Sequence, residues 1–325
     1  MQQFILPSPQ TILNLSKKLV AGILLACFSC DAVLANAVIE QAEIYKVRNQ
    51  VELSRKNKPN WSPAKLGDVI VPQDSVRTGN NSRADILFNE GTLVRTGANT
   101  VFLFPPGKRS FELTSGAALI MIRPEQGQST INTPQAKIVS QGTALFVQHD
   151  TENNVSLVGV LTDSTAGLVE VSSADGQVKV KLQAGQFVSI VRGVVGLVEH
   201  FVLPMFYETI ELSDGLGTGE EEFIAQQSPE VQATIQAVQA EAIAPLKNQI
   251  AWLNGFCSLQ VESEGISPLL QLLGMGVTGG KVTLELPETD LFVIPFRSID
   301  GITWLSNYCQ AQQEKSKLNS PNKSE

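Results

Sequence analysis

The arginines of a repeated tetrapeptide are the first residues whose type and spacing could do chemistry. Val-Arg-Thr-Gly occurs at Val76–Gly79 and again at Val94–Gly97. A guanidinium group binds carboxylate, sulfate or phosphate through paired hydrogen bonds, which makes Arg77, Arg83 and Arg95 candidate contacts for an anion or a partner. The alternative, which we favour, is that the repeat marks two strand ends. In that case glycine takes a positive φ in the turn, and the asparagine that follows tolerates one.

His149 is the candidate for acid–base chemistry, because the chain has only two histidines and Asp150 and Glu152 lie close to this one. A histidine with a carboxylate would suit a secreted hydrolase. However, His149 and Asp150 end an expected strand, and adjacent strand residues point to opposite faces. No serine or cysteine nucleophile is marked by a local signature. We therefore predict no catalytic residue and interpret His149 as a surface residue at a strand end.

One glycine motif matches a nucleotide-binding pattern by letter. Gly274–Gly279 reads GxGxxG, but that function needs a strand before the motif and a helix after it. Here an apolar helical run precedes the motif and a strand pattern follows it. We interpret the segment as a turn and predict no bound cofactor. No CxxC pair lies beyond the first 37 residues, so we also predict no metal site.

The N-terminal residues 1–37 have the pattern of an export signal. Two lysines precede the short apolar run Leu19–Phe28, and Ala35–Ala37 fits the small-x-small cleavage rule. A rival interpretation is lipid attachment at Cys27. The apolar run is too short to span a bilayer. Both interpretations predict an exported protein of the periplasm or cell surface, without a transmembrane helix in the mature chain.

Cys257 and Cys309 are the two cysteines that remain after such cleavage. In an oxidising compartment an even pair predicts a disulfide, closing a loop of about 50 residues. Two buried free thiols are the alternative.

Short β-strands are the elements that must position most of these residues. In Ala84–Phe88 the alternation places Ala84, Ile86 and Phe88 on one face, with Asp85 on the same face as Arg83. Gln177–Gln183 alternates valine or leucine with lysine, and Asp175-Gly176 before it predicts a type I′ hairpin turn.

The C-terminal part has a different pattern. We expect a helix that Ser228 caps, that Pro245 kinks or divides and that Gly255 ends, with its apolar stripe docked on the chain's own domain. Strands are expected at Lys281–Leu286 and Leu291–Pro295. The predicted organisation is a signal peptide at 1–37, an all-β domain at 38–204, a linker at 205–227, a helical and mixed region at 228–309, and a disordered tail at 310–325.

Composition narrows the classes of partner. Hydrophobic residues make up 43% of the chain, enough to fill a core, and the net charge is −8. Residues 38–207 hold 16 basic and 15 acidic side chains, whereas residues 208–325 hold 6 and 16. Nucleic-acid binding needs clustered positive charge, so this balance argues against it.

Turn glycines and strand hydrophobic residues recur in a recognisable order across the strand-rich part. The matching segments are Leu66–Ile70, Val76–Gly79, Ser82–Phe88, Asn89–Leu93, Gly97–Thr100, Phe111–Leu113 with Gly116, Asn132–Pro134, Gly142–Val147 and Leu182–Gln186. In this order they resemble the FecR domain, over roughly residues 44–190, and in particular the exported FecR-domain proteins of cyanobacteria.

From the residue patterns we expect a mainly β chain, in which a smaller α+β region follows the all-β domain. The resemblance implies that the all-β part is a periplasmic module, either solenoid-like or a sandwich of short strands. It also implies envelope signalling without catalysis. The founding members add a cytoplasmic segment and one membrane helix, and pass the state of an outer-membrane iron transporter to a sigma factor. This sequence departs from that plan at both ends.

From the residues and the resemblance together we expect a non-enzymatic sensing, regulatory or scaffold module that binds an envelope protein or a surface glycan. A secreted hydrolase that uses His149 and a structural envelope or matrix component are the alternatives.

Overall fold

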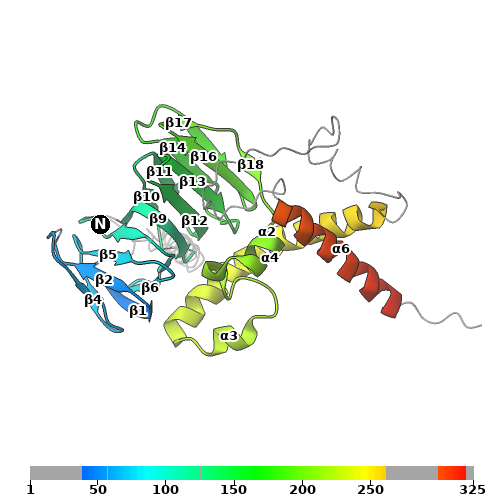
Figure 1. The fold of residues 1–325 in the computed structure, drawn as a ribbon, viewed down its shortest axis with the longest axis horizontal. Helices are drawn as coiled ribbons and strands as arrows, with labels where there is room; N and C mark the ends of the chain where they lie inside the picture. Colours follow the sequence, from blue (N-terminus) through cyan, green and yellow to red (C-terminus); the bar gives the residue numbers. More distant parts are fainter. Residues whose placement is uncertain (1–38, 57, 108, 125, 261–298, 320–325) are drawn as a thin grey trace, which may run out of the picture. The chain divides into compact units, whose positions relative to one another are not determined.

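The computed structural model of the protein describes residues 39–56, 58–107, 109–124, 126–260 and 299–319 (Figure 1). Three sets of predictions lie outside these residues. They are the signal peptide at 1–37 with the lipid site at Cys27, the glycine motif Gly274–Gly279, and the strands at Lys281–Leu286 and Leu291–Pro295.

The fold is mainly β, as predicted, and its strands form one continuous sheet that folds over into two layers. Layer A runs in the order β4-β1-β6-β7-β9-β12-β13-β16, with β17 and β18 both paired to β16. Layer B runs in the order β3-β2-β5-β8-β9-β10-β11-β14-β15. The strands are β1 Ala42–Arg48, β2 Val51–Ser54, β3 Trp61–Pro63, β4 Val69–Ile70, β5 Ser75–Thr78, β6 Arg83–Phe88, β7 Leu93–Thr96, β8 Val101–Leu103, β9 Ser110–Ile122, β10 Ser129–Asn132, β11 Ala136–Ser140, β12 Thr143–Asp150, β13 Val155–Val160, β14 Val169–Ser173, β15 Lys179–Leu182, β16 Gln186–Val191, β17 Val194–Val195 and β18 Glu199–His200.

Strand β9 belongs to both layers. Its first half pairs with β8 and β10 in layer B, and its second half pairs with β7 and β12 in layer A. The change occurs at Gly116, whose φ is +77° and whose missing side chain leaves room for Thr100 and Asn99. A Cβ atom there would lie 2.5 Å from the Thr100 Cα atom, so only glycine fits.

The two layers enclose one apolar core, which makes the domain a sandwich. Phe88 from layer A meets Phe104 and Phe111 from layer B edge-to-face, with ring centroids 5.2 and 5.0 Å apart. The alternation predicted in β6 is confirmed, because Ala84, Ile86 and Phe88 all join this core.

The two tetrapeptide copies end β5 and β7, as the strand-end interpretation predicts. The glycines, however, do not take a positive φ. Instead Asn81 (φ 49°) and Asn99 (φ 52°), each two residues after the glycine, adopt the positive φ. The two turns lie together, because the Asn99 N–H donates to the Gly79 carbonyl at 3.1 Å. The expected type I′ turn at Asp175-Gly176 is also wrong in detail, since only Gly176 has a positive φ, although β14 and β15 do pair as a hairpin.

Helices pack on the outward side of layer A (Figure 1). They are α2 Leu203–Thr209, the short 3₁₀ helix η1 Glu211–Ser213, α3 Glu221–Ala225 and α4 Pro229–Gln260. We call residues 203–260 the helical cover. Its apolar side chains, including Phe206 and Ile235, pack against Leu119, Met121 and Phe146 of layer A, which confirms that the stripe docks on the chain's own domain. The segment predicted as a linker thus holds three helical elements.

Helix α4 begins after Ser228, whose Oγ accepts the Val231 N–H at 3.4 Å. The predictions that Pro245 could divide this helix and that Gly255 ends it are wrong, because α4 continues through both residues. Packing of the apolar stripe outweighs the unfavourable propensity of these two residues.

A last helix, α6 Ile299–Asn319, contradicts the disordered tail over residues 310–319. A disulfide joins Cys257 of α4 to Cys309 of α6. Around it Leu253 and Leu305 form a small apolar cluster with Val202 and Met205. This anchorage supplies the stability that the polar sequence of α6 lacks. Among the helices of the described residues, none is long and apolar enough to cross a membrane.

Candidate functional site

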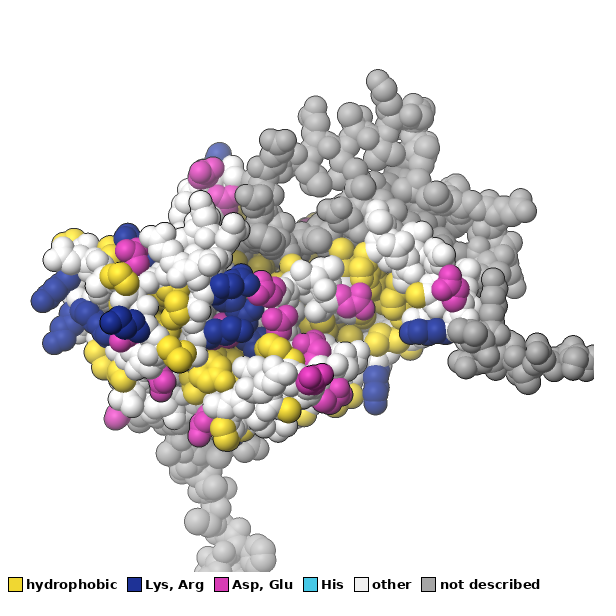
Figure 2. All heavy atoms as spheres, turned by 60° about the horizontal axis from the view of Figure 1, so that its bottom comes forward, with side chains coloured by type: hydrophobic (Ala, Val, Ile, Leu, Met, Phe, Trp, Pro, Cys, Tyr) yellow, Lys and Arg dark blue, Asp and Glu magenta, His cyan; other side chains and the backbone are white. Residues whose placement is uncertain are grey.

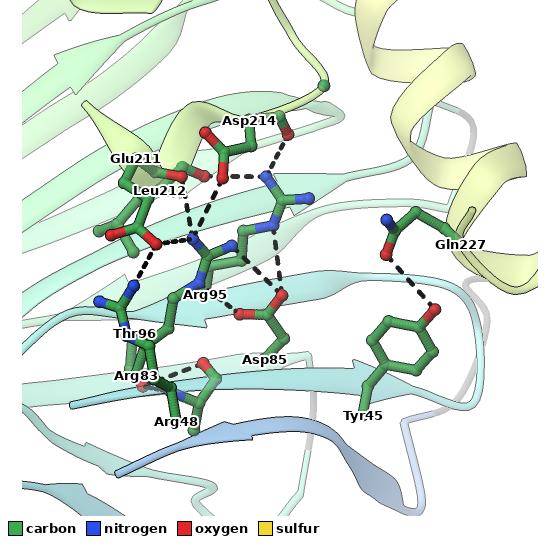
Figure 3. A network of polar contacts seen from close by, with 12 residues as sticks. Tyr45, Arg48, Arg83, Asp85, Arg95, Thr96, Glu211, Leu212, Asp214 and Gln227 are labelled. Carbon is green, nitrogen blue, oxygen red and sulfur yellow. Dashed lines mark hydrogen bonds and ion pairs between the residues drawn. The ribbon is translucent and has the colours of Figure 1, made fainter. Parts of the chain in front are cut away.

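Two of the three candidate arginines meet on the helix-facing side of layer A (Figure 3). Arg83 and Asp85 lie on β6, and Arg95 lies opposite Asp85 on β7. Arg83 Nε lies 2.8 Å from Asp85 Oδ1, and Arg95 Nε lies 3.6 Å from Asp85 Oδ2. The strand pairing therefore places one carboxylate between two guanidinium groups.

Both arginines also hold the chain that crosses above them. Arg83 Nη1 donates to the Glu211 carbonyl and Arg95 Nη1 donates to the Leu212 carbonyl, each at 2.9 Å. Arg95 Nη1 donates to the Asp214 carbonyl as well, and Arg83 Nη1 lies 3.5 Å from Asp214 Oδ2. These carbonyls belong to the one-turn helix η1 and to Asp214, the residue after it. We call Arg83, Asp85 and Arg95 with residues 211–214 the arginine clamp.

Burial and charge oppose each other in the clamp. Burial lowers the pKa of Arg95 to about 10, although Asp85 acts in the other direction. At Arg83 burial also disfavours the charge, but Asp85, Asp214 and Glu211 outweigh it and raise the pKa. Both guanidinium groups therefore stay charged at neutral pH.

The interpretation of Arg83 and Arg95 as contacts for an external anion or partner is wrong for this structure. Their exposed fractions are 2% and 1%, and their donors face Asp85 and the carbonyls of the helical cover. Asp85 and the carbonyls of residues 211–214 occupy the place that an anion would take. The physical cause is the cover itself, which closes the face that these strands present.

Arg77, the third candidate, lies on the outward face of layer B and has different partners. Its Nε lies 2.6 Å from Glu52 Oε2, and its guanidinium stacks over the Trp61 ring at 4.5 Å from the centroid. Its side chain is 40% exposed. Arg77 is thus reachable from solvent, but it already has a carboxylate.

His149 is buried at 3% exposure, so its interpretation as a surface residue is wrong. It points into the sandwich, where its Nδ1 lies 2.9 Å from Ser156 Oγ, and Ser156 Oγ lies 2.7 Å from Thr133 Oγ1. Burial lowers the pKa of His149. Asp150 instead accepts the N–H groups of Glu152 and Asn153 in the following turn.

The pairing of His149 with Ser156 was not predicted, because Ser156 lies on the next strand and carries no local signature. Both side chains are buried, Ser156 completely. Asp150, one carboxylate that the hydrolase hypothesis could use, ends β12 and caps the turn that follows through the N–H groups of Glu152 and Asn153. We therefore interpret the pair as a hydrogen-bonded polar contact inside the core. Within the described residues, no group of three or more His, Cys, Asp or Glu side chains could hold a metal ion.

The turn Asn89-Glu90-Gly91 has a purely architectural role in the structure. Asn89 Oδ1 accepts the Glu40 N–H at 3.1 Å, and the buried Glu90 carboxylate lies 3.1 Å from Arg109 Nη2. The Gly91 carbonyl accepts the Thr234 hydroxyl of α4 at 2.6 Å. The turn between β6 and β7 thus fixes the first half of α4 on layer A.

The partners of the clamp in residues 211–214 are the part that sequence reasoning missed. Glu211 and Asp214 lie in a segment that reads as a linker, more than 125 residues from Arg83. A signal was present in β6, where a charged pair alternates with core residues. Two charges on one face of a buried strand require partners.

The strand-rich part of the chain matches a known protein family. Residues 74–164 match the family model described as FecR protein. This span includes both tetrapeptide copies, the Asn89–Gly91 turn and strands β5 to β13, and it confirms the predicted resemblance for this part of the chain. The match covers less than a third of the chain.

Two solved structures of a "putative anti-sigma factor" from Parabacteroides distasonis are similar to part of the chain. The identities are 21% and 20%, and the TM-scores are 0.34 and 0.33. Each alignment covers 39% of this chain and 59% of the solved one. No curated protein matches the chain.

Proposed function

We propose that this chain is an exported, non-enzymatic FecR-domain protein that senses or regulates at the cell envelope by binding a protein or a glycan. The periplasm or the cell surface is its place of action. The match of residues 74–164 to the FecR family supports the regulatory role. Export rests on the signal pattern of residues 1–37.

The observation that carries the binding role is the difference between the two outward faces of the sandwich. The helical cover packs on layer A through a large apolar cluster. Within the described residues, no helix shares an apolar cluster with layer B, and most of its outward side chains, apart from serines such as Ser75 and Ser172, are partly or fully exposed. A broad sheet face that the described residues leave to solvent is available to a partner. The residues that could do acid–base chemistry, in contrast, have structural partners.

A site-directed crosslinking experiment tests the proposal. A photo-crosslinking amino acid is placed at Thr130 of β10, whose side chain lies on the outward face of layer B. In a matched variant it is placed at Glu230, which is exposed on α4. In intact cells of the native host, we expect an envelope macromolecule to be captured from Thr130 and not from Glu230. Cell fractionation of the same samples locates the protein.

Two results would overturn the proposal. One is capture of cytoplasmic proteins alone from Thr130, together with recovery of the chain in the cytoplasm. The other is capture from neither position at a crosslinking yield that a known envelope pair reaches in parallel.

A further inference from the structure

The outward face of layer B carries one continuous cross-strand row of side chains. In the register of β9, β10, β11, β14 and β15, the row consists of Glu112, Asn132, Lys137, Ser172 and Lys179. The neighbouring residues Ile131, Ile138 and Val171 point the other way, into the core. The row is therefore fixed on the solvent side by the same alternation that fills the sandwich.

Three lysines gather at one end of this face. Lys137 on β11 and Lys179 and Lys181 on β15 are all exposed, and Glu170 on β14 lies opposite Lys181. Strands are spaced about 4.8 Å apart, so the backbones of Lys137 and Lys179 lie about 10 Å apart. Lys179 and Lys181 are about 7 Å apart along their strand. The three positive charges thus lie on one face of the sheet, across neighbouring strands.

Protection of a sheet edge explains only part of this pattern. Lysines on an edge strand prevent pairing with other chains, and β15 is such a strand, paired to β14 alone. Lys137, however, lies on an interior strand, between β10 and β14. An edge function gives no reason for a lysine at that position.

The one carboxylate among the lysines reports their combined field. Lys179 Nζ lies 2.8 Å from Glu170 Oε1. Its hydrogen bond and charge lower the pKa of Glu170, and Lys181 and Lys137 add to the effect. Three lysines face two carboxylates, Glu170 and, at the far end of the row, Glu112, so the surface keeps a positive excess although the whole chain has a net charge of −8. In Figure 2, both acidic and basic side chains are spread over the visible face.

We propose that the outward face of β10, β11, β14 and β15 binds an acidic polysaccharide, a linear glycan with repeated carboxylate or sulfate groups. The inference rests on the proposed function and names its partner. A linear polyanion matches lysines spaced across neighbouring strands, and the Thr130 hydroxyl and the Asn132 amide on β10, beside β11, can bond to sugar hydroxyls. Glu170 is the internal counter-ion that the polymer displaces.

The test uses the purified full chain with polygalacturonate and dextran sulfate as probes and uncharged dextran as the control polymer. We expect binding of the acidic polymers at low ionic strength, loss of binding as salt screens the charges, and none to dextran. No binding of either acidic polymer at low salt would overturn the proposal.

A matched pair of triple variants locates the site. The first variant, K137Q/K179Q/K181Q, should lower the affinity at least about tenfold, because it removes the three cations that face the polymer. The control, K46Q/K58Q/K65Q, makes the same charge change at exposed positions elsewhere and should change the affinity less than about twofold. E170Q should raise the affinity severalfold. Equal losses in both triple variants would refute a located site.

Two further measurements distinguish an acidic polysaccharide from the other possible partners of this face, a second copy of the chain and an envelope protein. If K137Q/K179Q/K181Q abolishes self-association in sedimentation and leaves polymer binding intact, the face binds a second copy and the proposal is wrong. If crosslinking at Thr130 captures an envelope protein while neither polymer binds, the proposed function stands and the glycan inference fails.

Discussion

The two Val-Arg-Thr-Gly copies place the same four residues in two layers, and their arginines end in opposite environments. Val76 and Val94 both point into the shared core. Arg77 and Arg95 both point outward from their layers, yet Arg77 has a 40% exposed side chain and Arg95 is 1% exposed. The strand alternation sets the direction of each arginine, and what covers the layer sets its role.

This contrast separates what the tetrapeptide itself determines from what residues far along the chain determine. The tetrapeptide and its asparagine, two residues on, encode a strand end and a turn in both copies. The helical cover, far along the chain, turns Arg95 into part of the arginine clamp and leaves Arg77 as a surface residue. A motif of this kind therefore identifies the scaffold, and its function depends on which layer it occupies.

Substitution of the two arginines should produce the largest difference in stability between the two layers. Arg95→Met leaves Asp85 with a single cation and two carbonyls of the cover without their donor, which costs about 3–5 kcal/mol of unfolding free energy. Arg77→Met removes an exposed ion pair and costs about 0–1 kcal/mol. Urea unfolding followed by circular dichroism measures both. Equal losses would mean that the clamp does not hold the cover.

Removal of the disulfide tests how far the cover depends on α6. Cys257→Ser with Cys309→Ser opens a loop of 52 residues, and the chain-entropy account gives a loss of about 4 kcal/mol. Without reductant, neither cysteine of the native protein should react with an alkylating reagent in a mass-spectrometric assay. Alkylation of both in the folded, unreduced protein would contradict the cross-link.

The asparagines after the tetrapeptides should behave alike, in contrast to the arginines. Asn81→Ala and Asn99→Ala each place a Cβ-bearing residue without a helpful amide in the left-handed region, at a cost of about 1 kcal/mol. Asn81→Gly and Asn99→Gly should cost less, because glycine adopts this conformation readily. The melting temperatures of the four variants show whether positions 81 and 99 are equivalent. A large effect at one position alone would show that the turns are not equivalent.

A smaller, pH-dependent effect should come from the cover alone. Burial raises the pKa of Glu241 on α4 to about 7, so the folded protein binds more protons than the unfolded chain between about pH 4.5 and 7. The free energy of unfolding therefore falls as the pH rises through this range. Because Glu241 is only partly buried, we expect Glu241→Gln to stabilise the protein by about 1 kcal/mol at pH 8 and by almost nothing at pH 4.

The exposed Glu230 of the same helix provides the control for this effect. Glu230→Gln should leave the pH dependence of the melting temperature unchanged. A wild-type protein whose melting temperature rises from pH 5 to pH 8 while that of Glu241→Gln stays level would contradict the assignment.

The strands were predictable because their information is local. The alternation in β6 and the lysines of β15 place their side chains on the faces that the structure has. The burial of Arg83 and His149 was not predictable in this way, because their partners lie on other elements. The continuity of α4 through Pro245 has the same cause, since contacts with layer A support a helix that local propensity would interrupt.

Strand β9 ties the stabilities of the two layers together. Each half of this strand supplies backbone partners to a different layer, and a single glycine joins the halves. Opening either layer removes hydrogen-bond partners from a strand on which the other depends. The outward face of layer B and the face of layer A that carries the cover therefore unfold as one cooperative unit. A ligand that tightens layer B also raises the free energy needed to release the helices from layer A.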